Sequence, residues 1–223
     1  MTHGYRALIF DLDGVLADSA VLHFAAWQRL ARELDIPFDA QANEALKGVD
    51  RAGSLRRLLA LGGREVDAEL FAGLAARKNR YYLDLLAAVG PTSLLPGATQ
   101  LIAAARAASM RLAVASASRN AVVLLERLGI AAEFDFIADA GTIANPKPAP
   151  DIFLACAAAL GVAPRDCIGI EDAAVGIAAI VAAGMVAVGI GDAAGLPGAS
   201  LTFPATADVD LARVLRLPRS GVA

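Results

Sequence analysis

The second half of the chain alternates short apolar segments with alanine-rich stretches, several of which end at glycine. This alternation is typical of a parallel sheet whose strands are joined by helices. Together with an apolar run near the start, the pattern predicts strands over residues 7–10, 111–115, 134–138, 167–170 and 185–190. Helices are expected over residues 98–109, 120–128, 148–161 and 174–183. The fold class is therefore α/β with an open sheet.

Between residues 16 and 90 the strand candidates almost disappear. Helical patterns take their place over residues 21–34, 41–46, 53–61 and 66–88. Gly90, Pro91, Pro96 and Gly97 interrupt the chain before the sheet pattern resumes. We therefore predict a discontinuous core domain, residues 1–16 and 92–223, with a four-helix cap domain inserted at residues 17–91.

Composition excludes several classes of function. The chain has 223 residues, of which 57% are hydrophobic, enough to bury a substantial core. A formal net charge of -3 argues against nucleic acid or an anionic membrane as a partner. Because we find neither a secretory signal nor an apolar run near the roughly 20 residues that span a bilayer, we expect a cytoplasmic location. Cys156 and Cys167 are expected to be reduced and buried.

The first expected strand ends in two carboxylates and a glycine: Asp11, Asp13 and Gly14. Open parallel sheets bind ligands at the carboxyl ends of their strands. Taken alone, an Asp-x-Asp pair is as often a solvated turn or a helix cap. Its interpretation therefore depends on the polar residues that follow the other strands.

Ser116, Lys147 and the pair Glu171 and Asp172 stand at later strand exits or before helices. Each could be only a helix cap or a surface residue, but four such groups in one sheet favour a site. Carboxylates that converge there would repel one another unless a hard cation such as Mg²⁺ lay among them. Ser116 and Lys147 could then hold phosphoryl oxygens.

A carboxylate can act as a phosphoryl acceptor when a metal and a lysine offset the negative charge around it. Asp11 is therefore a candidate nucleophile. Asp13, two residues on, could donate a proton to the leaving oxygen and take one from the incoming hydroxyl.

In this order and spacing, these residues resemble the four motifs of the haloacid dehalogenase (HAD) superfamily. Within it, the chain most closely resembles the β-phosphoglucomutase family, and the resemblance spans the whole chain. It is carried by segments 18–19, 23–27, 46–51, 77–79, 115–120, 147–151 and 169–172. The resemblance implies a Rossmann-like, doubly wound parallel sheet core with an inserted four-helix cap.

The resemblance also implies a role for each matched residue. Asp11 would be the nucleophile and Asp13 the general acid/base, and Mg²⁺ would be held by Asp11, the Asp13 carbonyl, Glu171 and Asp172. Ser116 and Lys147 would bind the transferring phosphoryl group, and the second phosphate would be bound by Arg51, Ser118, Arg119 and Asn120. Further substrate-binding positions are Ala117, Gly48, Val49, Lys78, His23 and Trp27, with Ser19 as a hinge or supporting residue.

Three of these positions have simpler interpretations. Arg51 could be a solvated charge at a helix end. His23 stands on an apolar helix, where a histidine is more often a hydrogen-bonded core residue than a catalyst, so we expect it to support Asp13 and couple it to cap closure. Trp27, four residues on, is expected in the core of the cap.

The implied activity is the interconversion of β-D-glucose 1-phosphate and glucose 6-phosphate. It would proceed through an aspartyl phosphate and a β-glucose 1,6-bisphosphate intermediate, and glucose 1,6-bisphosphate would also serve as activator. We expect a monomer, because the cap must open and close over the core. The alternative is a Mg²⁺-dependent phosphatase on the same scaffold, acting on a small sugar phosphate or similar monoester. A dehalogenase needs neither Asp13 nor the pair Glu171 and Asp172. A non-catalytic binding or regulatory module would be suggested by the loss of Asp11, Asp13, Lys147 or Asp172, and all four are present.

Three positions depart from the family pattern. Arg119 replaces a common lysine, Ser19 replaces a common threonine, and Pro146 stands in a loop that usually lacks it. None of these changes removes a catalytic group. They leave the choice among glucose, other hexose and disaccharide phosphates open.

Overall fold

The computed structural model describes residues 4–219 and contains a six-stranded sheet in the order β3-β2-β1-β4-β5-β6. All neighbouring strands are parallel. The strands are β1 (Ala7–Phe10), β2 (Arg111–Val114), β3 (Phe136–Ile137), β4 (Cys167–Glu171), β5 (Val186–Ile190) and β6 (Leu201–Phe203). The chain builds outward from β1 on one side and from β4 on the other, so the doubly wound α/β fold is confirmed. The strand order reverses between β1 and β4, where such sheets bind ligands.

Helices cover both faces of the sheet because successive strand residues point to opposite sides. Leu8 and Phe10 belong to a core shared with α5 (Ala98–Ala107), α6 (Ala121–Leu128) and α9 (Leu211–Val214). Ala7 and Ile9 belong to a second core shared with α7 (Asp151–Leu160) and α8 (Ala174–Ala182). Burial on both faces explains why β1 and β4 read as continuous apolar runs.

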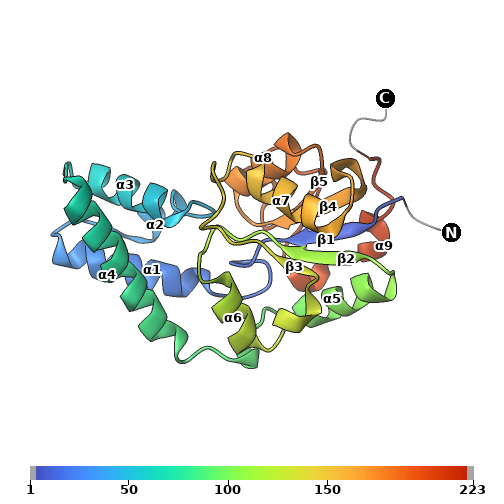
Figure 1. The fold of residues 1–223 in the computed structure, drawn as a ribbon, viewed down its shortest axis with the longest axis horizontal. Coiled ribbons are helices and arrows are strands. Elements are labelled where there is room, and N and C mark those ends of the chain that lie inside the picture. Colours follow the sequence, from blue (N-terminus) through green and yellow to red (C-terminus); the bar gives the residue numbers. More distant parts are fainter. Residues whose placement is uncertain (1–3, 220–223) are drawn as a thin grey trace.

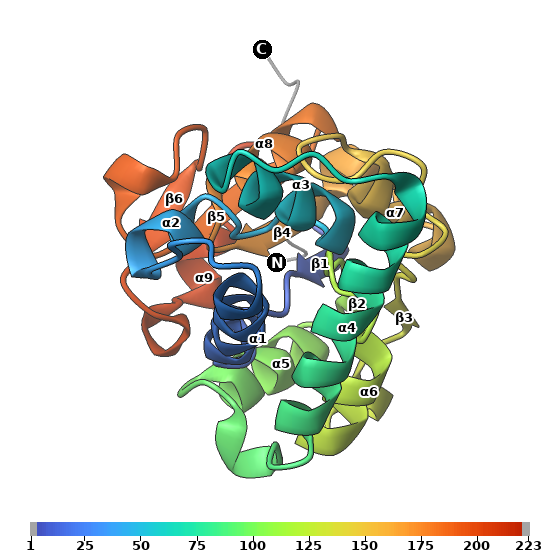
Figure 2. The same cartoon turned by 90° about the vertical axis from the view of Figure 1, so that its left-hand side faces the viewer.

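Four α-helices lie between β1 and α5 in the chain, and they are grouped apart from the sheet (Figure 1). They are α1 (Ala20–Glu33), α2 (Ala40–Glu44), α3 (Arg51–Leu61) and α4 (Ala68–Leu86). Viewed from their side, they stand in front of the strands (Figure 2). A third buried cluster, which includes Trp27, Leu30, Leu55 and Leu74, gives this layer a hydrophobic core of its own.

Several element boundaries differ from those expected from sequence. Helix α7 begins at Asp151 rather than at residue 148. Lys147 and Ala149 each precede a proline, and residues in that position avoid the helical conformation. Helix α3 begins at Arg51 rather than at residue 53, because the carboxylate of Asp50 accepts from the first free backbone N–H groups.

Two elements near the carboxyl terminus, β6 and α9, were not expected. Strand β3 is also shorter than predicted and covers only Phe136–Ile137. Within residues 4–219, none of the helices is both long and apolar enough to cross a membrane.

Candidate active site

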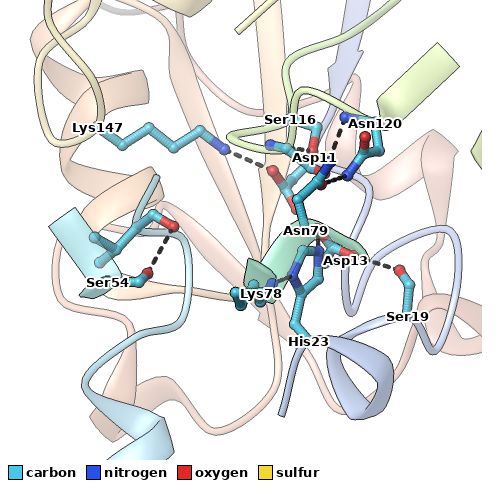
Figure 3. A network of polar contacts seen from close by, with 12 residues as sticks. Asp11, Asp13, Ser19, His23, Ser54, Lys78, Asn79, Ser116, Asn120 and Lys147 are labelled. Carbon is cyan, nitrogen blue, oxygen red and sulfur yellow. Dashed lines mark hydrogen bonds and ion pairs between the residues drawn. The ribbon is translucent and has the colours of Figure 1, made fainter. Parts of the chain in front are cut away.

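Charged side chains from three separate segments meet where β1 and β4 end. The backbone N–H of Asp11 donates to the carbonyl of Ile170 at 2.9 Å, which continues the β1–β4 pairing up to the first motif. Lys147 Nζ lies 2.6 Å from Asp11 Oδ1 and 2.7 Å from Glu171 Oε2. All three charged side chains are buried, and Figure 3 shows Lys147 extending to Asp11. The expected convergence of these motif residues is therefore observed.

The charges of this group influence one another strongly. Burial by itself would lower the pKa of Lys147, but the adjoining carboxylates of Asp11 and Glu171 raise it above the ordinary lysine value. Burial, followed by repulsion from Asp11, raises the pKa of Glu171 to about 7. The pKa of Asp172 is raised well above its usual range by burial and then by Glu171 and Asp11. One ammonium group thus does not offset the negative charge of this cluster.

Asp11, Glu171 and Asp172 can each offer one carboxylate oxygen within 4.8 Å of the others. Glu171 is held in place by its second oxygen, which accepts from the backbone N–H groups of Asp172 and Ala173 at 3.2 and 3.1 Å. An all-oxygen donor set with surplus negative charge suits a hard divalent cation such as Mg²⁺. The donor chemistry and the raised pKa values therefore fit the expected metal.

Two glycines allow these carboxylates to pack so closely. A Cβ at Gly14, whose φ is +84°, would overlap the Asp172 carboxylate, and a Cβ at Gly176 would overlap the Glu171 carboxylate. Any larger residue at either position would displace a candidate metal ligand.

Asp13 lies beside the cluster and forms a hydrogen bond with the hydroxyl of Ser19. Burial and then the charge of Asp11 raise the pKa of Asp13 to about 6, although the bond to Ser19 opposes the shift. The Nε2 atom of His23 lies 3.8 Å from Asp13 Oδ2. A carboxyl that titrates near neutral pH suits a group that must both donate and accept a proton.

A buried lysine enters the site from α4. Lys78 Nζ lies 2.7 Å from His23 Nδ1 and above the rings of Trp27 and Tyr82. Burial, followed by the charge of Arg51, lowers the pKa of Lys78 to about 7. The Lys78 side chain is therefore ready to gain charge when an anion approaches.

A cleft lies between the sheet and the four-helix layer. Its volume is about 740 Å³ when the solvent-filled space at its entrance is included. Of the predicted residues, those that line it are Asp11, Asp13, His23, Trp27, Gly48, Val49, Arg51, Lys78, Ala117, Ser118, Arg119 and Asp172. Ser116, Lys147 and Glu171 are buried and are not among the lining residues.

Three basic side chains line the cleft: Arg51 and Lys78 from the four-helix layer and Arg119 from the segment before α6. Burial and then the charge of Arg119 lower the pKa of Arg51, so the two guanidinium groups are close enough to repel. Mutual repulsion among cations in a partly closed cleft favours an anionic ligand between them.

Two further predicted residues, Asn120 and Ser19, do not line the cleft either. Asn120 donates from Nδ2 to Asn79 Oδ1 at 3.0 Å, and Ser19 is occupied by Asp13. Conversely, the sequence interpretation missed the lining residues Ala20, Asn43 and Ser54, whereas Leu46 and Lys47 line the cleft and belong to segment 46–51, which carries the resemblance. Ser54 could have been found, because it lies three residues after Arg51 and shares its face of α3.

Comparison with known proteins identifies the family. A haloacid dehalogenase-like hydrolase model matches residues 5–184, so the chain belongs to this family of enzymes. β-Phosphoglucomutase of Bacillus subtilis (strain 168) is 46% identical over 209 residues, 92% of each chain. Fructose-1-phosphate phosphatase YqaB of Escherichia coli (strain K12) is 33% identical over 192 residues, 85% of this chain and 98% of the relative.

The structural comparison agrees with the sequence comparison. The crystal structure of β-phosphoglucomutase from Clostridium difficile superposes with a TM-score of 0.92 at 41% identity, covering 94% of this chain and 95% of that one. The similar proteins thus include both phosphosugar mutases and phosphatases.

Proposed function

We propose that the chain is a β-phosphoglucomutase that interconverts β-D-glucose 1-phosphate and glucose 6-phosphate. The observation that carries the proposal is that Arg51, Lys78 and Arg119 line the same cleft as Asp11. A mutase of this kind must bind a phosphate remote from the nucleophile as well as the phosphate that reacts. The similarity to β-phosphoglucomutases supports the same assignment.

In the proposed reaction, an oxygen of Asp11 attacks the phosphorus, the bond from phosphorus to the sugar oxygen breaks, and Asp13 protonates that oxygen. In the reverse direction Asp13 takes the proton from the sugar hydroxyl that attacks the aspartyl phosphate. Two such transfers, separated by reorientation of glucose 1,6-bisphosphate, exchange the positions of the phosphate. Lys147 holds Asp11, and the buried hydroxyl of Ser116 supports the phosphoryl site.

The proposed metal is Mg²⁺, with Asp11, Glu171, Asp172 and the Asp13 carbonyl as its ligands. When bound, it would offset the negative charge of the carboxylates and the phosphoryl group during transfer.

We further propose that residues 17–91 act as a cap domain over a core formed by residues 1–16 and 92–223. A cap that carries Arg51 and Lys78 brings these cations to the substrate only when it closes. Closure would also exclude water from the aspartyl phosphate, so that a sugar hydroxyl is the acceptor.

The second candidate is a phosphatase acting on a sugar phosphate. It is favoured by the same Asp11 and Asp13 arrangement, which can deliver the phosphoryl group to water, and by the similarity to a fructose-1-phosphate phosphatase. The two candidates differ only in the acceptor.

The test incubates the protein with Mg²⁺, β-glucose 1-phosphate and a trace of glucose 1,6-bisphosphate, and measures glucose 6-phosphate and free phosphate together. Glucose 6-phosphate without matching free phosphate, lost in Asp11→Asn, supports the mutase. Free phosphate without glucose 6-phosphate would favour the phosphatase.

A further inference from the structure

A segment near the carboxyl terminus supports the loop that carries Asp13. The hydroxyl of Thr206, in the short 3₁₀ helix Thr206–Asp208, donates to the carbonyl oxygen of Val15 at 2.7 Å. Both residues are buried, although 191 positions separate them in the chain. Within residues 4–219, this is the one hydrogen bond that a side chain makes to the backbone of residues 14–17. Without it, a buried carbonyl would lose its partner, which is costly.

Residues 12–17 form a tight turn. The carbonyl of Leu12 accepts from the backbone N–H groups of Leu16 and Ala17 at 3.0 and 3.1 Å, and the N–H of Gly14 donates to the carbonyl of Ala17 at 2.9 Å. These bonds fix the shape of the turn, because they lie within it. They do not fix its position against the sheet, which depends on contacts from outside the turn.

Two parts of the chain hold the turn from outside. The backbone N–H of Leu95 donates to the carbonyl of Leu16 at 2.9 Å, but Leu95 lies in the second connection between the four-helix layer and the sheet. The 3₁₀ helix that carries Thr206 follows β6 and packs against that connection, since a Cβ at Gly97 would overlap the Cα of Ala207. The bond from Thr206 therefore anchors the turn to a segment outside both connections.

The position of Asp11 does not depend on this anchor. Its backbone N–H donates to the carbonyl of Ile170 at 2.9 Å, and its Oδ1 atom lies 2.6 Å from Lys147 Nζ. The side chain of Asp13 instead accepts from the hydroxyl of Ser19, which immediately precedes α1 of the four-helix layer. A shift of the turn would therefore move Asp13 and leave Asp11 in place.

We propose that Thr206 is a positioning residue, which fixes the turn of residues 12–17 and so holds Asp13 within reach of the oxygen that leaves the phosphorus. This inference rests on the proposed function, in which Asp13 is the general acid/base. Thr206 is not among the residues that line the cleft, so it acts through Asp13 and not on the substrate. Loss of its hydroxyl slows the steps that need a proton from Asp13 and spares a step that needs none.

Two phosphoryl donors separate these steps. With β-glucose 1,6-bisphosphate, an oxygen of Asp11 attacks the phosphorus, the bond to the sugar oxygen breaks, and that oxygen takes the proton of Asp13. With acetyl phosphate, the bond to the acetate oxygen breaks and acetate leaves as a stable anion, without a proton. A defect in the placement of Asp13 alone therefore slows the reaction of the first donor only.

The test measures, in saturating Mg²⁺, the rate at which each radioactively labelled donor phosphorylates Asp11. Thr206→Val keeps the shape of the side chain and removes the hydroxyl. We expect phosphorylation by the bisphosphate to slow by about three- to tenfold, the scale of one hydrogen bond, and phosphorylation by acetyl phosphate by less than about twofold. Thr206→Ser keeps the hydroxyl and should restore most of the rate with the bisphosphate.

Ile130→Val is the matched control for stability, because it removes one methyl group from a buried position that follows α6. Its rates with both donors should equal those of wild type. Equal slowing of both donors in Thr206→Val would overturn the inference, because the variant would then disturb the whole site. A wild-type rate with the bisphosphate would overturn it too, as would a Thr206→Ser variant as slow as Thr206→Val.

The proposed function can fail separately. A wild-type protein that releases phosphate from β-glucose 1-phosphate without forming glucose 6-phosphate would overturn the mutase assignment. The role of Thr206 would then be decided by comparing acetyl phosphate with β-glucose 1-phosphate as donors, because the sugar oxygen must still be protonated as it leaves.

Discussion

Lys78 Nζ lies 2.7 Å from His23 Nδ1, in a buried pocket between the Trp27 and Tyr82 rings. Burial, then the charges of Lys78 and Arg51, hold the pKa of His23 well below its usual range. The imidazole is therefore neutral at working pH and accepts the bond from Lys78. The titrating member of this pair is the lysine, whose pKa is lowered to about 7.

The first prediction concerns the pH dependence of substrate capture. Above pH 7 the free enzyme loses the positive charge of Lys78, so kcat/KM for the anionic substrate should fall as pH rises through about 7. Lys78→Arg keeps its charge at all working pH values and should lose this alkaline limb, even if its activity is lower. Arg80→Lys, on an exposed position of α4, should keep the wild-type profile. If kcat/KM of Lys78→Arg still fell above pH 7, the fall would have to be assigned to another titrating group.

The second prediction concerns the loop before α3. Gly48 has a φ of +69°, and a Cβ there would lie 2.7 Å from Val175 Cγ2 and 3.0 Å from Ala173 Cβ, just after Asp172. Gly48→Ala should keep this loop from seating on the core, lowering kcat/KM by at least about tenfold, since an overpacked contact costs roughly 1–3 kcal/mol. The assay is glucose 6-phosphate formation.

Gly73→Ala is the control for that substitution. Gly73 lies on an exposed turn of α4, and a Cβ there would meet no atom within 4 Å. Alanine at this position should therefore stabilise the helix by up to about 1 kcal/mol and leave activity intact. Wild-type activity in Gly48→Ala would show that close packing of this loop is unnecessary.

The third prediction concerns metal affinity. Because a Cβ at Gly176 would overlap the Glu171 carboxylate, Gly176→Ala should displace that ligand and raise the Mg²⁺ concentration for half-maximal activity by at least about tenfold. A Mg²⁺ titration of the activity measures the shift. Gly195→Ala, which meets no atom within 4 Å, should titrate as wild type. An unaltered midpoint in Gly176→Ala would argue against Glu171 as a ligand.

The fourth prediction concerns stability without metal. Lys147→Met leaves Asp11 and Glu171 buried with no countercharge, which should lower the free energy of unfolding by about 3–5 kcal/mol. Lys47→Met removes only a partly exposed pair with Glu44 and should cost under about 1 kcal/mol. Urea unfolding in EDTA measures both. Equal stabilities of the two variants would contradict the account of the buried charge cluster.

Residues next to fully buried strands could be placed from the sequence. Asp11 and Glu171 stand at the ends of apolar runs in β1 and β4, so the rule for parallel sheets brought them together correctly. Strand β6 and helix α9 were missed because three and four residues, respectively, are too few to carry a periodic pattern.

Contacts between the two layers could not be read from local pattern. The direction of the Asn120 amide and the presence of Asn43 in the cleft depend on how the four helices sit against the sheet. The domain boundaries, the monomeric state, the cytoplasmic location and the role of each site residue stay predictions.

The most direct test of the central claim is the fate of the phosphoryl group on Asp11. The protein would be labelled with radioactive acetyl phosphate in Mg²⁺ and mixed rapidly with or without β-glucose 1-phosphate, with Asp11→Asn as the unlabelled control. The account predicts that the sugar discharges the label much faster than water does, and that the label appears in glucose 1,6-bisphosphate. Label that appears as inorganic phosphate at the same rate with and without the sugar would contradict it.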